Sequence, residues 1–157
     1  MINFKIVLFA PEIPANTGNI GRLCIGTNSQ LHLIKPFKFF LNDKYLKRAG
    51  LDYWDKVELF VHDNWVDFLS FISSKGDVPP PNIYLCETDS SVIYTSPHYK
   101  QGDVFVFGRE SAGLPKNVLD SGLTRIYIPM SPHIRSINLC NSVAIILYEA
   151  MRQIDFL

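Results

Sequence analysis

Residues 4–34 read FKIVLFAPEIPANTGNIGRLCIGTNSQLHLI, and this stretch decides the fold class. The apolar run at 4–9 ends at Ala-Pro, which is typical of a buried strand. Asn16 is a favoured N-cap residue, so we expect it to begin a helix that ends near Ser29. A second short apolar run at 31–34 stops before a proline. Strand, helix and strand in this order predict a parallel α/β unit.

The rest of the chain continues the alternation of strands and helices. Short apolar runs predict strands at 59–61, 83–86, 104–107 and 125–128. Periodic or capped segments predict short helices within 42–58 and further helices at 65–72, 116–121 and 138–153. We therefore predict a single α/β domain over residues 1–157, with a mostly parallel sheet and helices on both of its faces.

Composition excludes several classes of protein. The chain has 157 residues, of which 47% are hydrophobic and 19% charged, which indicates a globular protein rather than a disordered one. No apolar run is long enough to span a membrane, and the first residues lack the pattern of a signal peptide, so we expect a cytoplasmic protein without a membrane partner. The three cysteines and four histidines lack metal-ligand spacing, so we expect reduced thiols and no metal.

Charge is distributed unevenly although the net charge is zero. Residues 35–56 hold six basic side chains and three aspartates, a local net charge of +3, whereas residues 57–93 hold one lysine and six acidic side chains, a local net charge of −5. Lys44, Lys47 and Arg48 have the spacings of one helical face. They predict a local patch for a nucleic acid, although a solvated charged loop explains the same asymmetry.

Three loops that follow predicted strands are rich in Asn, Gly, Ser and Arg, at 14–22, 107–115 and 128–142. Ligands of parallel sheets bind beyond the carboxyl ends of the strands, so these loops predict the binding site. The first matches neither the dinucleotide-binding pattern nor the P-loop pattern. In the second, two glycines flank Arg109 and Glu110, which suits close approach of a ligand. Taken singly, the loops also fit a capped helix start, a tight turn with a solvated ion pair and an elaborate helix cap.

The final predicted helix is more apolar than a surface helix. Residues 143–147 are apolar on every side, whereas a surface helix shows one apolar stripe. Burial in a thick monomer core and a homodimer interface both explain this pattern, and we favour the homodimer.

Taken together and in this order, the three loops resemble those of the SPOUT class of RNA methyltransferases. The similarity extends to the segments at 11–20, 31–34, 49–53 and 148–152, and so covers nearly the whole chain. The branch that the chain resembles most is the small tRNA ribose 2′-O-methyltransferases that act at the wobble nucleotide of the anticodon. The resemblance implies a C-terminal trefoil knot, a site for the methyl donor S-adenosylmethionine, a tRNA substrate and a homodimer with its active site near the subunit interface.

Matched by position, the resemblance also assigns roles to single residues. The donor site is expected to involve Cys86, Gly108, Leu114, Ile128, Met130, Ser136 and Leu139. Cys140 stands where a serine is usual, which weakens or removes a hydroxyl hydrogen bond. The catalytic set is Arg22, Asn16, Ser136 and Asn138, and the RNA is expected to contact Lys44, Lys47, Arg48, Tyr148 and Arg152.

The role of Arg22 has two interpretations. The matched residue is sometimes assigned in the family as the base that removes the ribose proton, but a guanidinium holds its proton too firmly to be a good base. We favour a phosphate contact that stabilises the developing alkoxide, with Asn16, Ser136 and Asn138 orienting the hydroxyl or Arg22. Two alternative functions stay open: ribose methylation of another RNA, such as ribosomal RNA, and RNA binding without catalysis.

Overall fold

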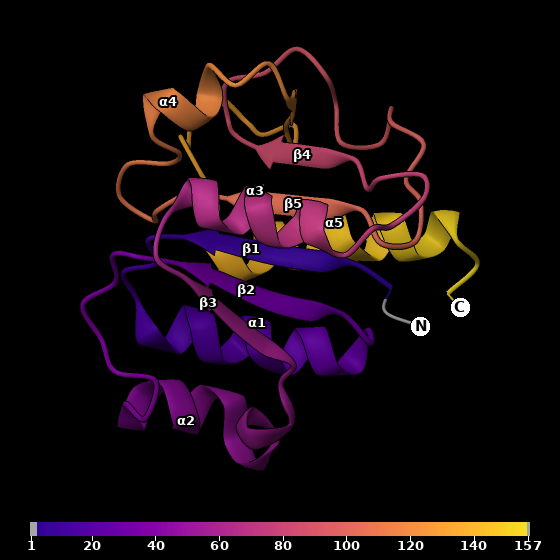
Figure 1. Ribbon diagram of the computed structural model, residues 1–157. Helices are drawn as coiled ribbons and strands as arrows, with labels where there is room; N and C mark the ends of the chain where they lie inside the picture. Colours follow the sequence, from indigo (N-terminus) through magenta and orange to yellow (C-terminus); the bar gives the residue numbers. More distant parts are fainter. Residues whose placement is uncertain (1–2, 157) are drawn as a thin grey trace.

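The computed structural model describes residues 3–156, so Met1, Ile2 and Leu157 of the predicted 1–157 domain lie outside the described residues. Strands and helices alternate along the chain (Figure 1). The strands are β1 (Lys5–Phe9), β2 (Gln30–Ile34), β3 (Leu59–His62), β4 (Ile83–Cys86), β5 (Val104–Phe107) and β6 (Thr124–Ile126). The helices are α1 (Pro14–Gly26), α2 (Lys44–Gly50), the 3-10 helix η1 (Leu51–Lys56), α3 (Trp65–Ser74), α4 (Lys116–Leu119) and α5 (Leu139–Gln153).

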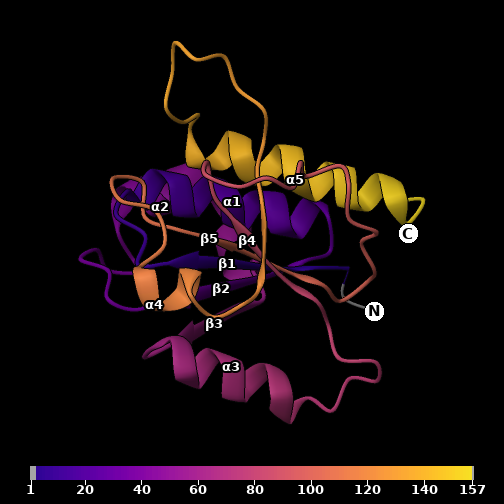
Figure 2. The ribbon, with the colours of Figure 1, turned by 90° about the horizontal axis from the view of Figure 1, so that it is seen from above.

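The strands form a sheet in the order β3-β2-β1-β5-β4-β6, and every neighbouring pair is parallel. Helices α1, α2 and α5 cover one face, and α3 and α4 cover the other (Figure 2). The predicted parallel α/β sheet with helices on both faces is therefore confirmed. The connections after β1 lead toward the β3 edge of the sheet, whereas the connection from β5 to β6 leads toward the β6 edge. The direction therefore changes between the neighbouring strands β1 and β5. In parallel sheets such a switch point opens a crevice at the carboxyl ends of the strands. Among residues 3–156, no helix is long and apolar enough to cross a membrane.

Several predicted boundaries differ from the structure, and helix α1 ends at Gly26 rather than near Ser29. The strand predicted at 125–128 ends at Ile126, because the chain beyond it leaves the sheet and lines a cavity. Helix α1 begins at Pro14 with Ile13 as its N-cap residue, so the prediction that Asn16 caps this helix is wrong. Proline suits the first helical turn, where its missing N–H group is not needed.

Two glycines of α1 let neighbouring helices pack closely against it. A Cβ at Gly18 would overlap the Leu46 carbonyl group of α2, and a Cβ at Gly21 would lie 2.7 Å from the Trp54 ring of η1. The Trp54 side chain is buried in this contact. The glycines therefore fix α2 and η1, which carry most of the basic segment, directly against α1.

A pair of histidines is buried between the β2–β3 part of the sheet and α3. His32 Nδ1 lies 2.9 Å from His62 Nε2, and the His32 ring is stacked on Phe60. One ring nitrogen donates and the other accepts, which suits two neutral rings. Burial, together with the neighbouring His62, lowers the pKa of His32 to about 3, and burial also lowers the pKa of His62.

This histidine pair predicts acid-sensitive stability. The unfolded chain protonates its histidines near pH 6.5, whereas the folded chain keeps His32 and His62 neutral below that pH, so stability is lost as the pH falls. We expect the free energy of unfolding, measured in urea, to drop by about 2 kcal/mol between pH 7 and pH 5. The drop should be smaller in His32→Leu, and an equal drop in that variant would contradict the assignment.

Candidate functional site

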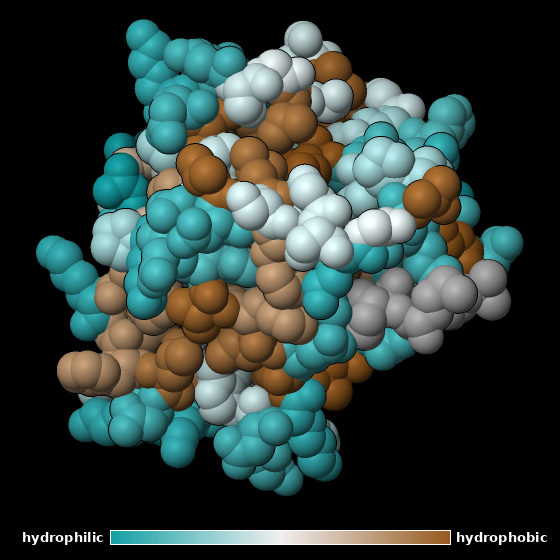
Figure 3. Space-filling model, viewed as in Figure 1, coloured by the Kyte–Doolittle hydropathy of each residue, from teal (hydrophilic) through white to brown (hydrophobic). Residues whose placement is uncertain are grey.

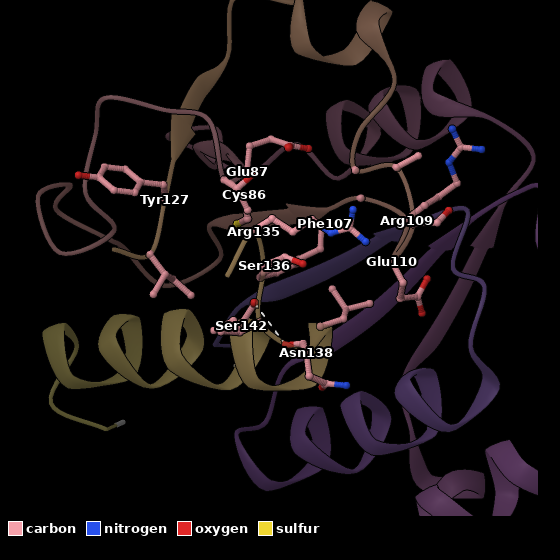
Figure 4. A pocket seen from close by; sticks show the side chains of 18 of the residues that line it. Cys86, Glu87, Phe107, Arg109, Glu110, Tyr127, Arg135, Ser136, Asn138 and Ser142 are labelled. Atoms are coloured by element: carbon pink, nitrogen blue, oxygen red, sulfur yellow. Dashed lines mark hydrogen bonds between the residues drawn. The ribbon is translucent and has the colours of Figure 1, made fainter. Parts of the chain in front are cut away.

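A cavity of about 670 Å³ lies at the carboxyl ends of β4, β5 and β6. Its walls come from the loops after these strands and from the segment that leads into α5, which projects beyond that helix in Figure 2. Figure 4 shows Arg135 and Ser136 between Cys86 and Asn138, with Phe107 beside Arg135. The volume falls within the range of small-molecule sites, about 300–1,000 Å³.

The cavity brings together most of the residues that the sequence predicted for the donor, namely Cys86, Gly108, Ile128, Met130, Ser136 and Leu139. Asn16 and Asn138 of the predicted catalytic set line it as well, so all three predicted loops contribute. The predicted Leu114 side chain does not line the cavity, because it is buried in the core with Val118 of α4. Only its backbone N–H group is directed to the site, where it donates to Glu87 at 2.7 Å.

Gly108 and Gly113 form a tight turn after β5. Arg109 and Gly113 exchange backbone hydrogen bonds of 3.1 and 2.9 Å, and Gly113 has a φ of +65°, which glycine adopts without strain. A Cβ at Gly108 would overlap the backbone of Gly113 and Leu114. The main chain of its own loop therefore requires a glycine at position 108, and close approach of a ligand to Gly108 stays a prediction.

Glu110 bonds to the loop after β1 rather than to the arginine that precedes it. Its carboxylate accepts the backbone N–H groups of Glu12 and Ile13, at 2.8 and 3.1 Å, and the Asn16 amide at 3.2 Å. Glu12 in turn accepts the hydroxyl and the backbone N–H group of Ser111, at 2.7 and 3.0 Å, and these bonds lower the pKa of its carboxyl group. Glu110 therefore supplies the capping acceptor that α1 lacks in its own sequence.

Asn16 connects the starts of two helices. Its amide donates to Glu110, and its Oδ1 accepts from Asn138 Nδ2 at 3.2 Å. Asn138 is the N-cap residue of α5, where its Oδ1 accepts the Cys140 N–H group at 2.8 Å. The Cys140 thiol lies 3.4 Å from Asn16 Oδ1, and burial raises the pKa of that thiol to about 11, so it remains a weak donor. Both polar groups of the Asn16 side chain are thus engaged within the protein.

Four charged residues line the cavity without being in the predicted donor and catalytic sets: Arg109 and Glu110 of the second predicted loop, and Glu87 and Arg135. Burial raises the pKa of Glu87, an effect that the hydrogen bond from the Leu114 N–H group partly opposes. Glu87 and Arg135 are neighbours of predicted residues, since Glu87 follows Cys86 at the end of β4 and Arg135 precedes Ser136. Their sequence positions directly beside predicted donor residues were the signal that could have identified them.

Arg22, the fourth residue of the predicted catalytic set, is not among the residues that line the cavity. It is exposed on α1, and its guanidinium carbon lies 5.8 Å from the centre of the Tyr53 ring of η1. Within one chain, the structure therefore separates Arg22 from the cavity that holds Asn16, Ser136 and Asn138.

The residues predicted to contact RNA lie on two helices. Lys44, Lys47 and Arg48 are exposed on α2, and Tyr148 is exposed on α5. Arg152 is also exposed but forms a two-bond ion pair with Glu149, with both N–O distances 2.9 Å. The α2 residues form the more continuous positive surface, because the Arg152 charge is already paired.

The structure is a parallel α/β fold with a cavity at the carboxyl edge of its sheet. Residues 3–148 match the model of the SpoU rRNA Methylase family, and the chain belongs to this family. A tRNA (cytidine(34)-2'-O)-methyltransferase of Methylovorus glucosotrophus is 46% identical to the chain, covering 98% of it and 97% of the relative. A putative tRNA (cytidine(34)-2'-O)-methyltransferase of Bacillus subtilis is 41% identical, covering 99% of the chain and 96% of the relative.

Solved structures agree with this assignment. One that concerns the 2-OH methylation of C/U34 on tRNA has a TM-score of 0.89 and 37% sequence identity, covering 97% of this chain and 96% of that one. The second is the SpoU methyltransferase AviRb from Streptomyces viridochromogenes in complex with the cofactor AdoMet. Its TM-score is 0.87 at 19% sequence identity, and the match covers 99% of this chain and 59% of that one, which shows that the fold is shared. The resemblance predicted from the sequence is confirmed.

The turn after β5 predicts that Gly108→Ala loses donor binding. The added methyl group would overlap the backbone of Gly113 and Leu114, so the loop must move and the cavity wall moves with it. Calorimetry with S-adenosylmethionine should show affinity at least about tenfold weaker, or about 1.4 kcal/mol. The control is Gly26→Ala, because no atom lies within 4 Å of a Cβ built there. Wild-type affinity in Gly108→Ala would refute this role of the turn.

Proposed function

We propose that the protein transfers a methyl group from S-adenosylmethionine to the ribose 2′-hydroxyl of the wobble nucleotide of tRNA, a cytidine or a uridine. The observation that carries this proposal is the cavity beyond β4, β5 and β6, which gathers residues from all three loops by which the chain resembles such enzymes. The relatives from Methylovorus glucosotrophus and Bacillus subtilis, named for cytidine(34) of tRNA, support the substrate because they match nearly the whole chain.

The cavity suits S-adenosylmethionine in shape and in charge. Ile128, Met130 and Leu139 provide apolar surface suited to an adenine ring, and Glu87 provides a carboxylate suited to a cationic ligand. When bound, the donor supplies a methyl group that is already activated on a positively charged sulfur. A cation near Glu87 favours its ionised form and so opposes the effect of burial. Within residues 3–156, no group of three or more His, Cys, Asp or Glu side chains is arranged to hold a metal ion.

The protein's own contribution to the reaction is alignment and the handling of one proton. The ribose hydroxyl loses its proton to solvent water as its oxygen takes the methyl group from the sulfonium, and we assign to Arg22 a phosphate contact that stabilises the developing negative charge. Ser136, which lines the cavity, orients the hydroxyl. Asn16 and Asn138 hold together the loops that form the site. Good alignment of the reacting groups lowers the activation free energy by roughly 7–11 kcal/mol.

A second copy of the chain is proposed to complete the active site. Arg22 lies outside the cavity, and α1 packs against α5. Of the apolar run that predicted a dimer, Val143 and Leu147 are buried, whereas Ile145 is 37% exposed and the neighbouring Tyr148 is 48% exposed. A homodimer through α1 and α5 covers these side chains and lets Arg22 of one protomer reach the cavity of its partner.

We also propose that the chain forms a trefoil knot and that the protein is cytoplasmic. The knot is supported by a contact between the chain after β6 and the loop between β4 and β5. The Tyr94 N–H group donates to the Tyr127 carbonyl at 2.9 Å, and the Tyr127 N–H group donates to the Val92 carbonyl at 3.0 Å. The chain after β6 therefore runs alongside an earlier loop before it enters α5. The cytoplasm is the proposed location because the substrate is tRNA.

The surface of α2 is the proposed first contact for tRNA. Lys44, Lys47 and Arg48 are exposed there, and Figure 3 shows hydrophilic residues along this edge of the molecule with hydrophobic patches beside them. Because the net charge of the chain is zero, RNA is attracted by a local field rather than by the whole protein.

Ribosomal RNA is the substrate of the second candidate function, which the description of the matched family favours. The relatives at 46% and 41% identity favour tRNA instead. A module that only binds RNA would not bind the methyl donor. Donor calorimetry therefore separates an enzyme from a binding module, and mapping of ribose methylation in tRNA and rRNA from cells lacking the protein separates the two enzymes.

The proposed role of Arg22 predicts a split between donor binding and methyl transfer. Arg22→Ala should slow single-turnover methylation of tRNA by at least about 100-fold, while calorimetry shows donor affinity within about threefold of wild type. Arg22→Lys should recover little activity, because an ammonium cannot hold two oxygens in the planar geometry of a guanidinium. Loss of donor affinity in Arg22→Ala would instead make Arg22 a structural part of the donor site.

The proposed dimer predicts that light scattering gives about twice the chain mass of 17.9 kDa. Ile145→Asp should yield monomers, because a carboxylate in an apolar interface loses its hydration, and methyl transfer should fall with dimerisation. Val66→Asp is the control, since Val66 is exposed on α3 at the opposite face of the sheet. A wild-type monomer at micromolar concentration would contradict the dimer.

A further inference from the structure

The 3-10 helix η1 presents an aromatic ring beside Arg22 that neither the donor site nor the basic patch accounts for. Tyr53 is 39% exposed, and the Arg22 guanidinium carbon lies 5.8 Å from its ring centre. The Lys56 ammonium also lies 5.8 Å from that centre. An exposed ring with two cations beside it offers an apolar face to a planar group and positive charge to an anion next to that group.

The packing of η1 on α1 holds this ring in place. Trp54 is buried, and its ring fills the space left by the missing side chain of Gly21. Arg22 follows Gly21 directly, so the same contact fixes Arg22 and Tyr53 relative to each other. Tyr53 is therefore displayed from a rigid support rather than from a mobile loop.

The geometry of a 3-10 helix also sorts the charges of this segment. With three residues per turn, side chains three apart share a face, so Lys56 lies on the face of Tyr53. The same rule places Asp52 and Asp55 together on another face. The charges beside the ring are consequently those of Arg22 and Lys56, although η1 contains acidic residues as well.

We propose that Tyr53 is a stacking platform for a nucleobase of the RNA substrate, next to the phosphate that Arg22 holds. This inference rests on the proposed function, since it requires an RNA with an unpaired base near the reacting ribose. An anticodon loop provides such bases, and stacking on an aromatic side chain is a general means of holding single-stranded RNA. The phosphate and the base of one strand segment would be bound by one cation and one ring that α1 and η1 hold together.

A structural alternative gives Tyr53 only the task of positioning Arg22. An aromatic ring near a guanidinium favours certain orientations of it, and this effect needs no contact with RNA. The two interpretations predict different effects of removing the Tyr53 ring. A platform contributes to RNA affinity, whereas a positioning residue changes the rate of transfer from bound RNA.

The test compares two variants of Tyr53. Tyr53→Phe keeps the aromatic ring, whereas Tyr53→Leu removes the ring but keeps an apolar side chain. We expect Tyr53→Leu to bind an anticodon stem-loop RNA about tenfold more weakly in fluorescence anisotropy, and Tyr53→Phe to bind within about twofold of wild type. A 2-aminopurine placed beside the target nucleotide should be quenched by wild type and by Tyr53→Phe but not by Tyr53→Leu. Unchanged RNA affinity in Tyr53→Leu, or a slower transfer step alone, would overturn the platform.

Phe71→Leu is the matched control. Phe71 lies on α3, on the face of the sheet opposite to α1 and α2, and the Lys75 ammonium lies 4.4 Å from its ring centre. Its loss should change RNA affinity by less than about twofold, and an effect as large as that of Tyr53→Leu would overturn the specific assignment. Equal thermal unfolding midpoints and donor affinities establish that the variants are folded. Failure of the proposed function itself is distinguishable, because wild type would then neither bind the stem-loop nor methylate its wobble ribose.

Discussion

The Glu110 carboxylate joins the loop after β5 to the first turn of α1, and the architecture of the site depends on this contact. It accepts N–H groups of Glu12 and Ile13, for which the helix has no acceptor of its own, and its charge lies at the positive end of the helix dipole. Asn16 continues the connection to Asn138, so α5 starts from the same network.

The strand order makes this network possible. β1 and β5 are hydrogen-bonded neighbours although they lie far apart in the sequence, so the loops at their carboxyl ends meet. The close packing of α1 on α2 and η1 then places Arg22 and the basic segment on the outer side of α1. One short helix thus contributes Asn16 to the donor cavity and Arg22 to a separate exposed surface, which is why a second protomer offers a simple way to unite them.

The two proposed ligands differ in charge, and the protein meets them in different places. A cationic donor suits the cavity that contains Glu87, whereas an anionic RNA suits the exposed cations of α1, α2 and η1. Because the net charge of the whole chain is zero, recognition depends on where each charge is held. The proposed methyl transfer takes place where the two regions meet.

The sequence by itself determined the alternation of parallel strands and helices, because buried strands and amphipathic helices leave local periodic patterns. Its motifs also indicated most of the residues proposed to bind the donor that line the cavity. The tertiary structure alone decided how those residues are used. Asn16 looked like a helix cap, yet the acceptor at that helix end is Glu110, 94 residues away in the sequence. Leu114 belonged to a recognised motif, but its side chain packs in the core. Local patterns record what a segment can bury, whereas hydrogen-bond partners and cavity walls depend on which distant segments the strand order brings together.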